Sequence, residues 1–264
     1  MVRGLGIFRE FFSGMEDNYV IIGGTACNIH EEAMQQEPRA TKDIDMILIV
    51  EALSDSFVRR FWEFISAGGY MQRQRGESVK KEKTGRSHEY FRFIKPENKD
   101  FPKQIELFSR NIGIMNAPED AHITPIPAGE DLSSLSAILM DDDYYHFTIS
   151  HSALVDGVHF ANPESLICLK AKAFLDMTRR KAEGEDVDQD DIEKHKKDVF
   201  RIIPTLSEDM RFPLPPKMRT DLRLFLDSIE TELPGKELFK AMKLPRLNAE
   251  ELVGKIRNIF DVYN

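Results

Sequence analysis

Two aspartates one residue apart stand at the start of an apolar run, where they could share one ligand. They are Asp43 and Asp45, and the run after them reads Met46-Ile-Leu-Ile-Val50. Side chains alternate between the two faces of an extended segment, so both carboxylates would project to the same side. Carboxylate oxygens that meet at one point suit a hard cation such as Mg²⁺. The pair therefore predicts a divalent-metal site for Mg²⁺ or Mn²⁺.

A short apolar run that ends in two glycines precedes this pair. The run reads Tyr19-Val-Ile-Ile-Gly-Gly-Thr25, and a segment compatible with a helix begins there. Gly23 and Gly24 lack Cβ atoms, so the phosphates of a ligand could approach the backbone closely. Thr25 stands where a helix N-cap belongs, and free N–H groups at a helix N-terminus attract anions. The order strand, turn, helix, strand indicates a nucleotide and metal site.

The glycine turn and the aspartate pair together resemble a known signature. The turn followed by Arg39-Ala-Thr-Lys-Asp-Ile-Asp45 is similar to the DNA-polymerase-β-like nucleotidyltransferase superfamily and, within it, to the AbiEii toxin-like nucleotidyltransferase family. The resemblance implies transfer of a nucleoside monophosphate from an NTP, such as ATP, to an acceptor, with release of pyrophosphate. Arg39 and Lys42 belong to the motif and are expected to bind the nucleotide with the glycine turn. Either motif alone is also common in ordinary turns.

Nucleotidyl transfer calls for a third acid on a neighbouring strand. Two divalent ions about 3.5–4 Å apart would stabilise the attacking and leaving oxygens, and carboxylates are their ligands. Superfamily members carry an acid between two hydrophobic residues, and Glu106 lies between Ile105 and Leu107 in this way. Glu106 is therefore expected to complete the metal site or to act as a base toward the acceptor hydroxyl. Alternation alone would also produce an outward-facing charge on an edge strand.

A second resemblance lies in the C-terminal half of the chain. The stretch Pro163-Glu-Ser-Leu-Ile-Cys-Leu-Lys-Ala-Lys-Ala173 is similar to the family's helix that carries a lysine toward the nucleotide. Lys170 matches that lysine, and Lys172 takes the place of a frequent second basic residue. The resemblance implies that Lys170 steadies the β- and γ-phosphates as a point charge. The alternative is a pair of solvent-exposed helix lysines.

The following helix of the family also has a counterpart. The stretch Lys196-Lys-Asp-Val-Phe-Arg-Ile202 places Asp198 at the family's acidic position, so Asp198 joins the expected catalytic residues. Arg201 departs from the pattern, because many relatives have a further acid there. This departure favours a second interpretation, a nucleotide-binding or interaction protein with the same fold and no turnover. A nucleotidyltransferase of the antibiotic-modifying type is a third.

Composition restricts the remaining classes. The chain has 264 residues, of which 41% are hydrophobic and 31% charged, as in a globular protein with a core. No apolar run approaches the roughly twenty residues of a membrane span, and the N-terminus lacks a signal-peptide pattern. Cys27 and Cys168 are far apart in apolar surroundings, which predicts buried thiols and a cytoplasmic location.

Charge bears on the acceptor. The net charge of −9 argues against binding of nucleic acid over the whole surface, yet residues 71–103 hold ten Lys or Arg against five Asp or Glu. This stretch could receive a triphosphate or an RNA acceptor, or could be an ordinary solvated loop. The resemblance leaves tRNA, a protein or a small molecule as acceptor, and a cognate antitoxin as a further partner.

Hydrophobic periodicity predicts an α/β (α+β) fold with a mixed sheet and flanking helices, followed by a helical C-terminal domain. The expected domains are residues 1–160 and 161–264. Expected strands cover 19–22, 44–50, 90–94 and 104–108, and a further extended run covers 144–149. Expected helices cover part of 1–18 and then 25–36, 54–67, 165–181, 192–203 and 218–230, with two shorter helices ending near Val262.

Overall fold

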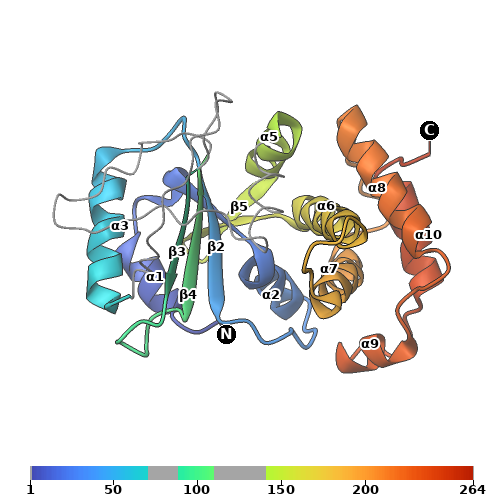
Figure 1. Cartoon of the computed structure of the whole chain (residues 1–264), viewed down its shortest axis with the longest axis horizontal. Coiled ribbons are helices and arrows are strands. Elements are labelled where there is room, and N and C mark those ends of the chain that lie inside the picture. Colours follow the sequence, from blue (N-terminus) through green and yellow to red (C-terminus); the bar gives the residue numbers. More distant parts are fainter. Residues whose placement is uncertain (1, 71–88, 110–140, 264) are drawn as a thin grey trace. The chain divides into compact units, whose positions relative to one another are not determined.

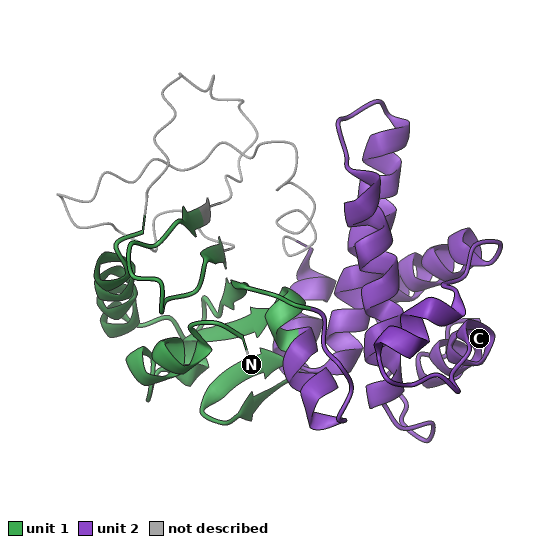
Figure 2. Cartoon of the chain, turned by 90° about the horizontal axis from the view of Figure 1, so that it is seen from below, with its two compact units in different colours: residues 1–26, 40–129, 152–161 green, residues 27–39, 130–151, 162–264 purple. Residues whose placement is uncertain are grey.

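The computed structural model describes residues 2–70, 89–109 and 141–263, which form two compact units. Unit 1 contains residues 1–26, 40–129 and 152–161, and unit 2 contains residues 27–39, 130–151 and 162–264 (Figure 2). One division between the units falls inside helix α2 (Gly23–Ala33). The chain thus enters each unit more than once. The single boundary expected between residues 160 and 161 stays a prediction.

Unit 1 contains a six-stranded mixed sheet with the strand order β3-β4-β2-β1-β6-β5 (Figure 1). Strand β2 runs antiparallel to β1 and parallel to β4, while β6 runs parallel to β1. The strands are β1 (Tyr19–Ile22), β2 (Asp43–Leu48), β3 (Glu89–Ile94), β4 (Gln104–Ser109), β5 (Ser152–Val155) and β6 (Val158–Ala161). The predicted mixed α/β architecture is confirmed, and the first four strands fall within two residues of their expected limits.

Aromatic side chains pack two helices, α1 (Leu5–Phe11) and α3 (Asp55–Gly68), against the sheet of unit 1. Their neighbouring ring centroids lie 4.5 to 6.4 Å apart, within the range of favourable aromatic pairs. The cluster consists of Phe8, Phe12, Tyr19, Phe57, Phe61 and Phe64, all fully buried. It fixes one face of the sheet as the core of unit 1. The opposite face carries Asp43, Asp45 and Glu106.

Strands β5 and β6 form a hairpin that the sequence analysis did not predict. Its turn contains Asp156 and Gly157, with φ angles of 48° and 73°. Positive φ at both central residues is typical of a two-residue hairpin turn, and Asp-Gly favours it. Each strand has only four residues, too few for a clear alternation of polar and apolar side chains.

Unit 2 is built mainly from helices. Helix α6 packs against α7 and α8. The helices are α5 (Asp142–Ser150), α6 (Pro163–Ala182), α7 (Gln189–Ile202), a 3₁₀ turn η2 (Ile203–Thr205), α8 (Pro216–Ile229), α9 (Lys236–Ala241) and α10 (Ala249–Ile259). The expected helices of the C-terminal half are therefore present. No helix among the described residues is long and apolar enough to cross a membrane.

The expected extended run over 144–149 is wrong, because these residues belong to α5. Asp141 caps this helix, since its carboxylate accepts a hydrogen bond from the backbone N–H of Asp143 at 3.0 Å. Asp142 and Asp143 in the first turn also favour the positive end of the helix dipole. These end effects outweigh the β propensity of the Tyr, Phe, Thr and Ile residues that follow.

The predicted buried thiols are confirmed. Cys27 and Cys168 are free and buried, and both belong to unit 2. Burial raises the pKa of Cys27 to about 12, which keeps the thiol protonated at neutral pH. Both cysteines therefore act as small apolar side chains of the core.

Candidate active site

The three predicted metal ligands lie on one face of two adjacent strands in unit 1. In the parallel pairing of β2 and β4, Asp45 stands opposite Glu106 and Asp43 opposite Gln104. Residues in register on neighbouring strands project to the same face, and strands lie about 4.8 Å apart. Strand β4 lies between β3 and β2, so Glu106 is not on an edge strand. The alternative interpretation of Glu106 as an outward edge charge is therefore wrong.

Glu106 already has two partners in the structure. Its Oε1 lies 2.7 Å from Nη2 of Arg92 and accepts a hydrogen bond of 2.6 Å from Nε2 of Gln104. Arg92 stands directly opposite Glu106 in the antiparallel pairing of β3 and β4. The described part of the chain contains no group of three His, Cys, Asp or Glu side chains that could hold a metal ion. Glu106 is thus held by a cation, and a divalent ion at Asp43 and Asp45 stays a prediction.

Gly23 has a role that the sequence did not indicate. It has a φ of 68°, and a Cβ atom built on it would lie 2.0 Å from Oδ2 of Asp45. Only glycine leaves room for this carboxylate and adopts this backbone conformation without strain. The space beside the turn was expected to admit the phosphates of a ligand. At Gly23 that space accommodates the Asp45 side chain, while Gly24 follows inside helix α2.

The expected N-cap role of Thr25 is wrong. Helix α2 begins at Gly23, so Thr25 is its third residue. The Thr25 side chain is fully buried, and its Oγ1 donates a hydrogen bond of 2.5 Å to the backbone carbonyl of Asp43. This bond joins the first turn of the helix to the start of β2. Thr25 therefore helps to position the aspartate pair instead of offering its hydroxyl to the helix end.

In unit 2, Lys170 and Asp198 form a buried ion pair. Nζ of Lys170 lies 2.9 Å from Oδ2 of Asp198, and Nε of Arg39 lies 3.3 Å from Oδ1. Burial opposes the charge on Asp198, but Lys170 and Arg39 outweigh it and lower the pKa of Asp198 to about 2. Burial likewise disfavours the charge on Lys170, yet the Asp198 carboxylate raises its pKa. Lys170 is thus a buried, paired cation and not a solvent-exposed lysine.

Lys172 has a different environment from Lys170. Its Nζ lies 2.9 Å from Oδ2 of Asp221 on α8. The hydroxyl of Tyr144 on α5 donates a hydrogen bond of 3.0 Å to the same oxygen. Asp221 therefore connects three helices of unit 2. Lys172 contributes to this connection, whereas Lys170 pairs with Asp198 on α7.

Arg201 also has a buried partner. Its Nη2 lies 2.8 Å from Oε2 of Glu31, and it donates a further hydrogen bond to the backbone carbonyl of Glu37. Burial raises the pKa of Glu31, although the Arg201 guanidinium opposes this shift. Arg201 and Glu31 are 170 positions apart, so no local sequence pattern could have paired them. The departure from the family pattern at Arg201 thus coincides with a complementary acid on α2.

The expected site residues divide between the two units. Those of unit 1 are Gly23, Gly24, Thr25, Lys42, Asp43, Asp45 and Glu106; those of unit 2 are Arg39, Lys170, Lys172 and Asp198. A shared site for both groups stays a prediction. The basic residues between positions 71 and 88 lie outside the described residues. A scan against protein-family models and a search of curated proteins found no match to the chain. The family resemblance therefore depends on the motif residues alone.

Proposed function

We propose that the protein is a metal-dependent nucleotidyltransferase of the DNA-polymerase-β-like type. Within that type, it would be related to the AbiEii toxin-like nucleotidyltransferases. It would move a nucleoside monophosphate from an NTP to an acceptor hydroxyl. The observation that carries the proposal is the placement of Asp43 and Asp45 on one sheet face, beside Gly23 and the start of α2. Glu106 stands next to Asp45 on that face. The motif order and this local geometry agree, which neither motif would require by itself.

Each residue of unit 1 has a defined part in this reaction. Backbone N–H groups in the first turn of α2 would bind the triphosphate, because they have no partner within the helix. Asp43 and Asp45 would hold Mg²⁺ or Mn²⁺. When bound, such an ion neutralises charge on the phosphates and on the attacking and leaving oxygens. Thr25 would hold Asp43 in place through its backbone carbonyl.

The bond changes are those of in-line substitution at the α-phosphorus. A bond forms between the acceptor oxygen and this phosphorus, and the bond to the pyrophosphate oxygen breaks. The acceptor proton leaves to a base, for which Glu106 is the candidate. Before it could accept this proton, the Glu106 carboxylate would have to leave Arg92 and contact the acceptor hydroxyl. The role implied for Lys170 toward the β- and γ-phosphates would require its ion pair with Asp198 to accept a third partner.

A nucleotide-binding protein without turnover is the second candidate. The pairing of Glu106 with Arg92 favours it, because a carboxylate oxygen that already contacts a guanidinium is less available to a metal ion or an acceptor hydroxyl. Arg201 supports the same alternative, since it occupies a position where an acid was expected. Both candidates require the nucleotide to bind, and they differ only in the transfer step.

Transfer of a labelled nucleoside monophosphate tests the proposal. The full chain would be incubated with each labelled NTP, Mg²⁺ or Mn²⁺, and tRNA, protein and aminoglycoside acceptors. Label should pass to one acceptor class, and the variant Asp43→Asn with Asp45→Asn should lose all transfer. The control Asp186→Asn with Asp190→Asn removes two acids elsewhere and should retain it. NTP binding without transfer to any acceptor would favour the second candidate.

A further inference from the structure

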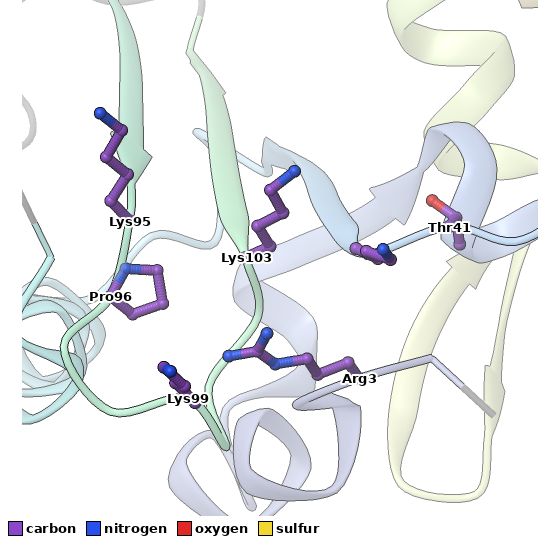
Figure 3. Close-up of a pocket in the computed structure, with 7 residues that line it drawn as sticks. Arg3, Thr41, Lys95, Pro96, Lys99 and Lys103 are labelled. Carbon is purple, nitrogen blue, oxygen red and sulfur yellow. The ribbon is translucent and has the colours of Figure 1, made fainter.

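A cavity of about 510 Å³ in unit 1 is lined by five basic side chains (Figure 3). They come from three segments: the N-terminal residues, the approach to β2 and the connection from β3 to β4. The five are Arg3, Lys42, Lys95, Lys99 and Lys103, with the hydroxyl residue Thr41 beside them. We refer to them as the basic pocket. The described residues of its lining include no acid.

Backbone contacts bring the members of the basic pocket together. The N–H of Lys103 donates a hydrogen bond of 3.0 Å to the carbonyl of Lys42, which extends the pairing of β2 and β4 by one residue. Gly4 packs against the residues that precede β4, so closely that a Cβ atom on it would lie 2.3 Å from Pro102. Arg3, the neighbour of Gly4, lines the same pocket as Lys103. The chain thus tolerates like charges side by side, which ordinarily destabilises neighbouring strands.

The connection that carries Lys95 and Lys99 is also well anchored. The N–H groups of Glu97 and Asn98 donate hydrogen bonds of 3.2 Å to the carbonyls of Gly69 and Gly68. Tyr70 donates a further bond of 2.8 Å to the carbonyl of Pro102. A fixed backbone lowers the entropy that a ligand must remove when it binds. The pocket is therefore preorganised at its backbone, while its lysine side chains remain exposed.

The cations of the basic pocket have no carboxylate partner among the described residues. Within residues 2–70, 89–109 and 141–263, no Asp or Glu oxygen lies within 4.0 Å of the charged nitrogens of these five side chains. Five such charges in one place contrast with the net charge of −9 for the whole chain. An uncompensated positive field of this kind attracts an anion and raises its local concentration.

We propose that the basic pocket binds an oligophosphate, that is, several linked phosphate groups on one ligand. Lysine amines and a guanidinium form charge-assisted hydrogen bonds with phosphate oxygens. The volume falls within the usual 300–1,000 Å³ of ligand sites, which is room for more than one phosphate. The described residues of the lining include no aromatic side chain on which a base could stack. The phosphates belong either to a free inorganic chain or to a single-stranded nucleic-acid backbone.

This inference goes beyond the proposed transfer reaction. The lining includes none of Gly23, Asp43, Asp45 and Glu106, so phosphate binding here needs neither the metal site nor turnover. Lys42 was expected to bind the nucleotide, and it precedes Asp43 directly in the chain. An oligophosphate in the basic pocket would therefore lie close to the start of β2.

Two ligands and two charge-matched variants test the inference. Inorganic tripolyphosphate and a labelled short single-stranded oligoribonucleotide would each be titrated into the full chain at several salt concentrations. For at least one ligand, Lys99→Gln with Lys103→Gln should raise the Kd about ten-fold and reduce the slope of log K against log[salt] by about 1.4, since each single-strand phosphate contact contributes about 0.7. The control Lys236→Gln with Lys240→Gln alters two exposed lysines of α9 and should change neither quantity.

The outcomes also separate the two phosphate sources. Binding of tripolyphosphate alone supports a free oligophosphate, and binding of the oligoribonucleotide alone supports a nucleic-acid backbone. Equal weakening by both variants, or no binding of either ligand, would overturn the inference. Asp43→Asn with Asp45→Asn should leave oligophosphate binding intact. Failure of the basic pocket would therefore be distinguishable from failure of nucleotidyl transfer. Unchanged melting temperatures would show that each variant is folded.

Discussion

The buried cations of unit 2 differ from the cations of the basic pocket in their partners. Lys170 and Arg201 are buried, and each lies 2.8 to 2.9 Å from a carboxylate of Asp198 or Glu31. A buried charge must be paired because removal from water costs several kcal/mol per ion. The pocket cations are exposed, and water compensates them until a ligand arrives. The paired cations therefore hold unit 2 together, whereas the exposed cations of the basic pocket are available for binding.

The largest expected effect comes from breaking a buried pair. Arg201→Leu leaves Glu31 buried without its cation, so it should lower the free energy of unfolding by about 3–5 kcal/mol in urea titrations. Glu31→Leu with Arg201→Leu removes both charges and should recover most of this loss. The control Arg179→Leu breaks exposed pairs on α6 and should cost less than about 1 kcal/mol. A loss at Arg201 as small as that at Arg179 would contradict the structural role of the pair.

The next effect concerns the close approach at the turn of unit 1. Gly23→Ala introduces a methyl group 2.0 Å from Oδ2 of Asp45 and also strains a positive φ. We expect a loss of about 2–3 kcal/mol, from about 1–2 kcal/mol of backbone strain plus the displaced carboxylate. Gly184→Ala is the matched control, because its φ is +91° and its Cβ would meet no atom within 4 Å. Equal losses at Gly23 and Gly184 would show that Asp45 does not occupy the turn.

A smaller effect should appear in the pH dependence of unit 2. Burial, with help from the nearby Lys170 charge, lowers the pKa of His195 from 6.5 to about 3. The unfolded chain therefore binds a proton near pH 6.5 that the folded chain refuses, so stability falls as the pH drops from 6.5 toward 3. The contribution of Asp198 is lost only at lower pH, between 3.8 and about 2.

Melting temperatures between pH 7 and pH 4.5 check this prediction. His195→Gln should flatten the decline relative to the unaltered chain, while His146→Gln on the exposed side of α5 should not. The raised pKa of Glu31 changes stability in the opposite direction as the pH falls. This contribution is the same in all three proteins, so it cancels when their profiles are compared. Identical pH profiles for all three proteins would contradict the assignment to His195.

Local patterns in the sequence predicted the elements that local physics decides. The apolar run before the glycine pair gave β1 its correct limits, and Ser54 and Gly69 mark the ends of α3 as its caps. Helix α5 was missed because two sequence signals oppose each other there: Asp141 favours a helix start, whereas the residues that follow have high β propensity. Glu106 was expected on a strand next to the aspartate pair, and β4 does pair with β2 so that Asp45 and Glu106 lie side by side.

The partners of the site residues could not be predicted. Arg92 meets Glu106 through the register of β3 and β4, which no spacing in the sequence reveals. Arg39 meets Asp198 across 159 positions, and Lys42 meets Lys103 where two strands begin. Such contacts depend on how distant segments pack. The residue types indicated the chemistry, but the structure shows which charges are paired and which are exposed.

Binding of Mn²⁺ together with a nucleotide is the sharpest test of the metal site, because it needs no knowledge of the acceptor. Free Mn²⁺ would be followed by electron paramagnetic resonance while the full chain is titrated in the presence of each NTP. We expect saturable, nucleotide-dependent binding that disappears in Asp43→Asn with Asp45→Asn and persists in Asp186→Asn with Asp190→Asn. Equal Mn²⁺ binding by the unaltered chain and the Asp43, Asp45 double variant would contradict a metal site at the start of β2.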